Sequence, residues 1–196
     1  MVILSAFKGG VSPPKVALYG GLPCTYLAWK YTLRNGFAKI GFDQNSGNMV
    51  TAIMLVCSGL LFFEKGDADL IAKIFSIPCL LIGLVGYVSQ DTLASTIYGV
   101  AKFEGAKTDI LVKSTMGVYI TWGVFAVSLL FGKDWTEALG YAALWCLVQD
   151  IDTLLISKDV EKLGSSPVIE YFYTLINAGV AAGCLSSVTE SVEKVD

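Results

Sequence analysis

Long apolar runs alternate with short polar breaks along the chain, and residues 110–157 show this most clearly. Two apolar runs are separated there only by a Gly-Lys-Asp turn at 132–134, and residues 115–131 carry no charge. Each run approaches the ~20 residues that an α-helix needs to cross a bilayer. In water such helices would be apolar all round, whereas in lipid they satisfy every backbone group internally. The pattern therefore predicts a membrane-spanning helical hairpin.

Two further stretches predict the rest of an all-α membrane bundle with short loops. Residues 48–88 form a second helical hairpin, with Pro78 inside its second helix, where a proline kinks the chain. Residues 168–187 form a last span, and an acidic tail follows at 188–196. The whole chain, 1–196, is expected to be a single integral membrane domain.

Residues 1–47 are less regular. A mixed leader ends in Pro13-Pro14, and the prolines predict that no helix forms before about Val16. The apolar segment from Val16 to about Leu33 contains two glycines and a proline, so it is either a weak span or a segment at the membrane surface. A polar, glycine-rich loop at 34–47 completes this part of the chain.

Residues 89–109 form the longest connection. Asp91 is expected to cap an amphipathic helix that lies on the membrane surface, with an apolar stripe that includes Leu93 and Phe103. At the starts of two runs, acids stand four residues before lysines, as Asp69 before Lys73 and Asp109 before Lys113. Residues at this spacing share a helix face, so each acid can pair with its lysine at the start of the helix.

The distribution of Lys and Arg bears on the number of spans. If the segment after Val16 does not cross, ten Lys and Arg residues share one side and four lie on the other; if it crosses, the split is eight to six. Positive residues concentrate on the cytoplasmic side of membrane proteins. Five spans are therefore expected, with the two termini on opposite sides, and six spans are the alternative.

Composition supports a membrane protein and excludes several kinds of site. The chain of 196 residues is 54% apolar and 16% charged, with a mean hydropathy of +0.62, whereas a soluble domain carries roughly 25% charge. A net charge of −3 without a basic cluster argues against nucleic-acid partners. The chain has no histidine, which removes His-ligated haem, chlorophyll, zinc and copper, and no metal site is expected.

Acids inside the apolar runs are the candidates for chemistry, because an ionisable group in a membrane is costly. Asp150 lies ~8 Å from the midpoint of its run, if residues 135–156 form one unbroken helix. A proton or ion path would use Asp150, Asp152 and Glu170, with Glu170 as the partner of Asp150. The alternative is that the helix reaches the interface near Asp150, where the acids meet water or a neighbouring lysine.

The last apolar run carries groups suited to helix packing. Asn177 lies in mid-span and is expected to form a hydrogen bond to another helix. Small residues at 178–183 form a face that lets a second helix approach closely. The positions expected to make this close contact are Ala178, Gly179, Ala182 and Gly183.

Three functions follow from these observations. The first is a non-catalytic accessory subunit that packs against other membrane subunits, as in photosynthetic or respiratory membranes of the thylakoid or organellar inner type, with lipid or pigment bound. The second is a small oligomeric transporter or channel for protons or small ions that uses Asp150; a weak repeat of Ser-(Gly)-Leu-Leu-Phe near 58 and 128 favours it. The third, a membrane enzyme, lacks a reactive constellation, and the chain is expected not to be one.

Overall fold

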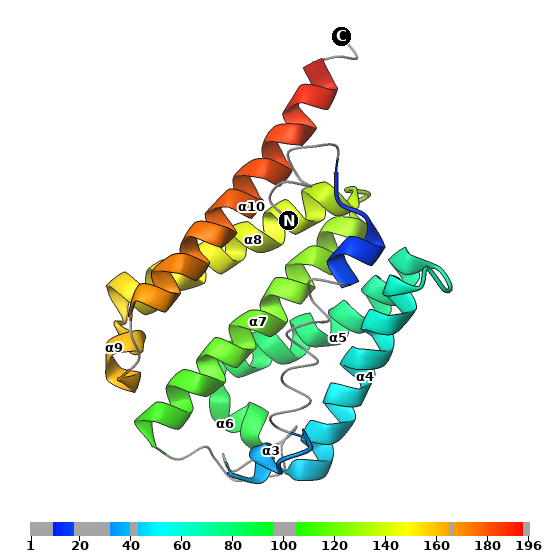
Figure 1. The fold of residues 1–196 in the computed structure, drawn as a ribbon. Coiled ribbons are helices and arrows are strands. Elements are labelled where there is room, and N and C mark those ends of the chain that lie inside the picture. The colour runs from blue at the N-terminus through cyan, green and yellow to red at the C-terminus, as the bar shows by residue number, and fades with distance from the viewer. Residues whose placement is uncertain (1–9, 18–31, 40–42, 96–104, 165–166, 194–196) are drawn as a thin grey trace.

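The computed structural model describes residues 10–17, 32–39, 43–95, 105–164 and 167–193. These residues are helical or in turns, with no strand among them, which confirms the predicted all-α fold (Figure 1). The helices in chain order are α3 (Gly36–Lys39), α4 (Gln44–Phe62), α5 (Ala68–Val88), α6 (Gln90–Leu93), α7 (Ala106–Leu130), α8 (Trp135–Ile151), the π-helical turn η3 (Asp152–Ile156), α9 (Asp159–Leu163) and α10 (Pro167–Glu193).

Within the described part of the chain, four helical stretches are long and apolar enough to cross a membrane. They cover residues 44–62, 68–88, 108–130 and 135–156, and they indicate a membrane protein. The two predicted hairpins are thus present as α4–α5 and α7–α8. The expected count of five or six spans is not confirmed, because α10 is not among these four.

Aspartate caps fix where three of these helices begin. The carboxylates of Asp43, Asp67 and Asp134 accept hydrogen bonds from the backbone N–H three residues later, at 2.7–3.0 Å. The cap at Asp43 explains why α4 begins at Gln44, inside the loop expected at 34–47. The side chain of Gln44 then donates a hydrogen bond to the side chain of Asn48 at 2.6 Å, so these two polar residues of the first turns are paired along the helix.

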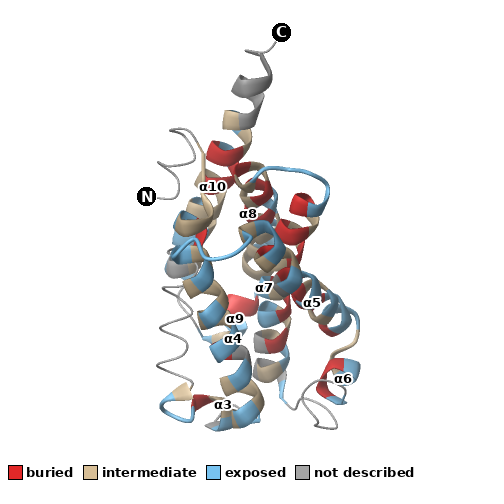
Figure 2. Ribbon diagram, turned by 90° about the vertical axis from the view of Figure 1, so that its right-hand side faces the viewer, coloured by how far each residue is buried: buried red, intermediate tan, exposed pale blue. Residues whose placement is uncertain are grey.

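Glycines bring α5 and α7 into backbone contact. A Cβ atom on Gly83 would lie 3.0 Å from both the backbone N of Ile120 and the backbone O of Met116. Gly86 faces Met116 closely, and Gly123 faces Leu80. Small residues allow this approach in lipid, where packing rather than hydrophobicity holds helices together. Figure 2 shows the resulting buried stripes along α5, α7 and α8.

The turn between α7 and α8 matches the expected tight break. After the C-terminal residue Leu130, Gly132 adopts φ +77°, a left-handed conformation that favours glycine. Lys133 N then donates to the carbonyl of Ser128 at 3.1 Å, which closes the helix end. Asp134 caps α8 directly afterwards, so three residues suffice to reverse the chain.

The part of the chain before α3 differs from expectation. Residues 13–17 are helical, and Val16 N donates to Ser12 O at 3.1 Å, so the helix begins at the prolines rather than after them. Proline fits the first turn of a helix because its missing N–H would have no partner there. The expected weak span after Val16 falls on residues 18–31, outside the described residues.

The expected surface helix at 89–109 also begins differently. Ser89, not Asp91, is the N-cap of α6, and its Oγ accepts from Thr92 N at 3.3 Å. Leu93 is fully buried against Val112 and Met116 of α7, so the start of this connection belongs to the bundle core rather than to its surface. Residues 96–104, which include Phe103, lie outside the described residues.

Candidate functional site: a polar cluster at the end of α8

The candidate acids gather where α8 passes through η3 into α9. The α-helix ends at Ile151, and residues 152–156 form a π-helical turn in which Ser157 N donates to Asp152 O at 2.7 Å. Such a wider turn is frequent at functional sites and changes the face on which the next residues lie. The helix expected over residues 135–156 is therefore continuous, but its last turn is π-helical rather than α-helical.

Asp152 faces α7. The Lys113 ammonium group donates to the Asp152 carboxylate at 2.5 Å and lies 3.8 Å from Asp159. Lys162 completes the group by contacting Asp159 at 3.2 Å. The expected pairing of Lys113 with Asp109 on the same helix is thus wrong, because η3 and α9 bring two carboxylates to Lys113 from another part of the chain.

Asp159 is the buried member of this ion-pair network, with 5% of the residue exposed. Burial favours its neutral form, but hydrogen bonds from Ser157 and Lys162 and the nearby lysine charges outweigh it, and the pKa of Asp159 lies below the usual value of 3.8. The network therefore remains charged at neutral pH and ties α7 to α9.

Asp150 faces α10 instead. The amide of Asn177 donates to the Asp150 carboxylate at 3.0 Å, which agrees with the expectation that Asn177 bonds across helices. Glu170 lies near enough to Asp150 for electrostatic repulsion between the two carboxylates. The structure thus brings together Asp150, Asn177 and Glu170, and it separates them from Asp152, as the two-residue spacing implies.

Gly117 of α7 provides a third set of polar contacts that sequence reasoning missed. Its carbonyl accepts from Trp145 Nε1 at 3.3 Å and from Thr121 Oγ1 at 3.0 Å. The amide of Gln149 packs directly on its Cα, where any Cβ atom would overlap it. The only sequence signal for this contact is a glycine four residues before a threonine in an apolar run.

The face of α10 that contacts α8 differs from the small-residue face at 178–183. Val180, Ala181 and Cys184 form a buried cluster with Ala143 of α8. Of the four expected packing positions, Gly183 is buried, Ala178 and Gly179 are half-buried and Ala182 is exposed. A second helix on the face of Ala178 and Ala182 stays a prediction.

The opposite end of the bundle carries a separate group of polar contacts. Trp135 Nε1 donates to Asp69 at 2.5 Å and so joins the two hairpins; the expected contact of Asp69 with Lys73 is replaced by this bond. Lys133 pairs with Glu137 at 2.8 Å, and this hydrogen bond raises the pKa of Lys133. These groups lie in turns and first helical turns, as expected at a membrane interface.

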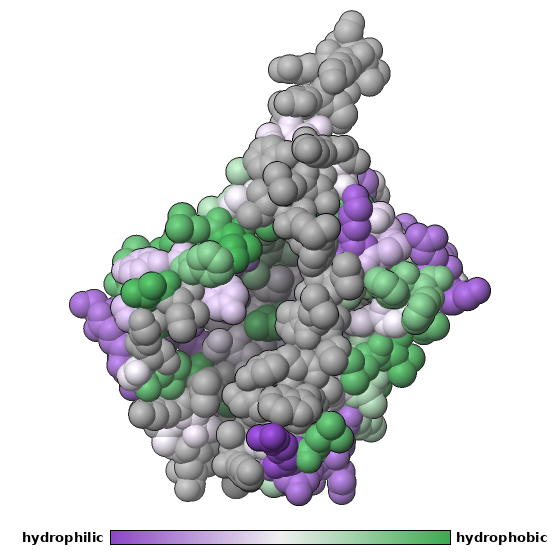
Figure 3. Space-filling view, in the orientation of Figure 1, coloured by the Kyte–Doolittle hydropathy of each residue, from purple (hydrophilic) through white to green (hydrophobic). Residues whose placement is uncertain are grey.

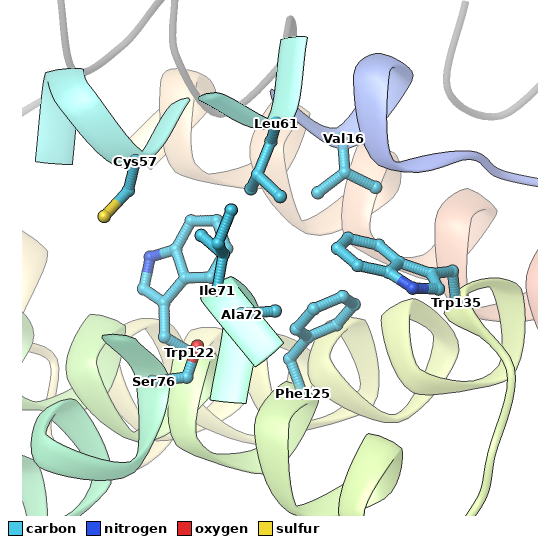
Figure 4. A pocket seen from close by; sticks show the side chains of 9 residues that line it. All are labelled: Val16, Cys57, Leu61, Ile71, Ala72, Ser76, Trp122, Phe125 and Trp135. Atoms are coloured by element: carbon cyan, nitrogen blue, oxygen red, sulfur yellow. The ribbon is translucent and has the colours of Figure 1, made fainter. Parts of the chain in front are cut away.

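A small apolar hollow lies between α4, α5, α7, the start of α8 and residues 13–17 (Figure 4). Its volume is about 20 Å³, enough for one water molecule, whereas small-molecule sites occupy roughly 300 Å³ or more. The residues that line it are Val16, Cys57, Leu61, Ile71, Ala72, Ser76, Trp122, Phe125 and Trp135. In the described ranges, no group of three or more Cys, Asp or Glu side chains is placed to hold a metal ion.

Polar contacts thus lie at both ends of the bundle and at Gly117 within α7. The contacts of Lys113 with Asp152, of Asn177 with Asp150, of Trp135 with Asp69 and of Trp145 with Gly117 run between helices, so they hold the helices in register. Comparisons with protein-family models, with curated proteins and with solved structures find no match to this chain.

Proposed function

We propose that this chain is a non-catalytic integral membrane subunit that packs against other subunits of a membrane complex. The observation that carries this proposal is the exposure of α4. Only 6% of its spanning stretch is buried, against 41% for the stretch at 108–130. Packing contacts are what hold a helix in a membrane bundle, since lipid is as apolar as its side chains. The free flank of α4 is therefore the surface that we assign to a partner helix.

This flank is a continuous apolar stripe. The side chains recur at helical spacing along α4 and are all exposed, from 39% to 70%. They are Met49, Ile53, Val56, Leu60 and Phe63. Figure 3 shows hydrophobic surface over α4 and over α8 and α10, with hydrophilic surface at α9 and at the turn between α4 and α5.

The polar residues support a structural rather than a catalytic role. Lys113 and Lys162 balance the charges of Asp152 and Asp159, and Asp150 accepts a hydrogen bond from Asn177. A reactive group would need a free side chain and space for a substrate beside it. The hollow of about 20 Å³ beside α4 offers little such space.

We assign α10 as a further span beside the four apolar helices. It has 27 residues, which corresponds to a length of about 40 Å. Val180 and Cys184 of α10 pack against Ala143 of α8. By analogy with the many small subunits of energy-transducing complexes, a photosynthetic or respiratory membrane is the proposed location. Lipid or pigment between subunits belongs to this proposal. Visible absorption of the gently purified complex tests for pigment, and this chain has no histidine to serve as its axial ligand.

The test is purification in mild detergent followed by identification of co-migrating chains. Val56→Trp on α4 is compared with Leu81→Trp on α5, since these residues are 61% and 60% exposed. We expect partner chains with the wild type and with Leu81→Trp, and their loss with Val56→Trp at unchanged thermal stability. A wild type that migrates alone as a homogeneous homo-oligomer, or equal loss from both variants, would contradict the proposal.

A second function, a proton or small-ion transporter, is favoured by one observation. Asp150 of α8 accepts a hydrogen bond from Asn177 of α10, and Glu170 of α10 lies within electrostatic range of Asp150. In proteoliposomes, a transporter of this kind would lose most of its ion flux in Asp150→Asn. Asp91→Asn at the start of α6 is the control that keeps its flux. Absence of flux in the wild type, or unchanged flux in Asp150→Asn, would remove this function.

A further inference from the structure

We infer that residues 10–17 and helix α3 lie on opposite sides of the membrane, so that residues 10–17 share one side with the C-terminal part of α10. The bundle has two ends, which we call the hairpin end, with the turns at 63–67 and 131–134, and the α9 end, with α3, α6 and α9 (Figure 1). The inference rests on the proposal that the helices cross a bilayer. It disagrees with the preferred expectation of five spans and agrees with the six-span alternative, in which the segment after Val16 crosses.

Residues 10–17 are fixed at the hairpin end. Val11 N donates to Thr136 Oγ1 at 2.8 Å, and Thr136 lies in the first turn of α8, two residues after the turn at 131–134. The Val11 side chain packs against the cluster that contains Cys184 near the C-terminal part of α10. Val16 lines the hollow beside Leu61, one residue before the end of α4.

Helix α3 is fixed at the α9 end. Ala38 N donates to Oε1 of Gln44, the first residue of α4, at 3.1 Å. The ring of Phe37 packs on Gly47, so closely that a Cβ atom there would overlap it. Gly47 and Leu61 are 14 residues apart on one helix, which separates these two sets of contacts by about 21 Å.

The chain therefore passes from one end of the bundle to the other between residues 17 and 32. The 14 residues in between can bridge this distance easily, since an extended chain covers about 3.3 Å per residue. Lys15 then shares a side with Lys65 and Lys133, and Arg34 lies opposite. Because α10 runs from α9 back to the hairpin end, its C-terminal part lies on the side of residues 10–17 (Figure 1).

Single cysteines in a chain whose five native cysteines are replaced by alanine test this arrangement. Lys15→Cys and Ala38→Cys are the reporters, and Lys65→Cys and Glu161→Cys mark the hairpin end and the α9 end; all four positions are exposed. A membrane-impermeant maleimide is applied to intact vesicles and then to permeabilised ones. Ser12→Cys repeats the first reporter while keeping the charge of Lys15.

We expect Lys15→Cys and Ser12→Cys to be labelled to the same extent as Lys65→Cys before permeabilisation, and Ala38→Cys to the same extent as Glu161→Cys. Because each reporter is compared with a marker, a mixed orientation of the vesicles does not affect the result. Labelling of Lys15→Cys and Ser12→Cys in parallel with Glu161→Cys would overturn the inference. Complete labelling of all positions in intact vesicles would instead refute the membrane assignment on which it rests.

Discussion

One lysine, Lys113, links three parts of the chain, because its ammonium group contacts Asp152 of η3 and Asp159 of α9 from α7. Lys113 and Asp152 are 32% and 25% exposed in their side chains, so solvent screens the pair only in part. Removing one member of such a pair leaves the other charge without its partner, which costs more than the pair itself contributes.

Lys113→Met should therefore lower the free energy of unfolding by about 1–3 kcal/mol, less than for a fully buried pair because solvent partly screens this one. Lys113→Met combined with Asp152→Asn should recover part of this loss, since the uncompensated carboxylate is then gone. Thermal unfolding of the single and double variants in the same detergent measures both values. Equal stability of wild type and Lys113→Met would show that the ion pair does not contribute to the stability of the fold.

A pH dependence belongs to Asp159, which is outside the spanning helices. Its pKa is lower in the folded protein than the usual 3.8, so the folded state binds fewer protons than the unfolded state near that pH. The stability it contributes is present above pH 3.8 and is lost as the pH falls through the lower folded pKa. Asp159→Asn should show a smaller loss of thermal stability than wild type between about pH 5 and 3, and an equal loss would contradict this assignment.

At this scale, local sequence rules predicted the partners of few residues. Asn177 was expected to bond across helices, and it does so with Asp150. The pairing of Lys113 with Asp109 was expected from their spacing, but spacing along one helix carries no information about a neighbouring element. Asp152 contacts Lys113 of α7, and its distance of 39 residues along the chain is why no local spacing rule could pair the two.

The contact between α5 and α7 shows what determines packing between elements. A Cβ atom on Gly83 would lie 2.8 Å from Cγ1 of Ile120 and 3.0 Å from two backbone atoms of α7, so a methyl group there would have to move the α7 backbone as well as a side chain. Gly59 of α4 has nothing within 4 Å of the corresponding position. The two glycines thus provide a matched pair within long apolar helices.

Gly83→Ala should destabilise the protein by about 1–3 kcal/mol, because overpacking forces the helices apart. Gly59→Ala should be neutral or stabilise it by up to about 1 kcal/mol, because alanine has the higher helix propensity. Unfolding in detergent, followed by circular dichroism, gives both values. Equal effects of the two substitutions would mean that α5 and α7 do not approach as described.

Hydropathy predicted which elements exist, since the four apolar stretches appear as helices where runs were expected. Helix starts were less accurate: α4 begins at Gln44 because Asp43 caps it, and residues 13–17 are helical because proline suits a first turn. The glycines between α5 and α7 could not be identified, because choosing among 20 glycines requires knowing which helix faces meet. For the same reason the sequence could not identify Val180 and Cys184 as the residues of α10 that contact α8.

At the scale of the whole molecule, apolar side chains cover the flanks and charged ones lie toward the two ends. Exposed large hydrophobic residues occur on every spanning helix, for example Val56 on α4, Ile74 on α5 and Val148 on α8. A monomeric soluble protein rarely exposes continuous apolar surface beyond a few hundred Å². This distribution of side chains, rather than any single residue, is the reason to expect that the fold is stable in lipid and not in water.

The protein should therefore stay with the membrane fraction after washing with high salt and with alkaline carbonate, and mild detergent should release it. Salt weakens charge contacts but not the burial of apolar surface in lipid. When detergent is removed without added lipid, we expect aggregation, because the stripe from Met49 to Phe63 and its counterparts on the other helices would face water. Fractionation followed by size-exclusion chromatography measures both steps. A monodisperse chain without any amphiphile would refute the membrane assignment and, with it, the proposed subunit.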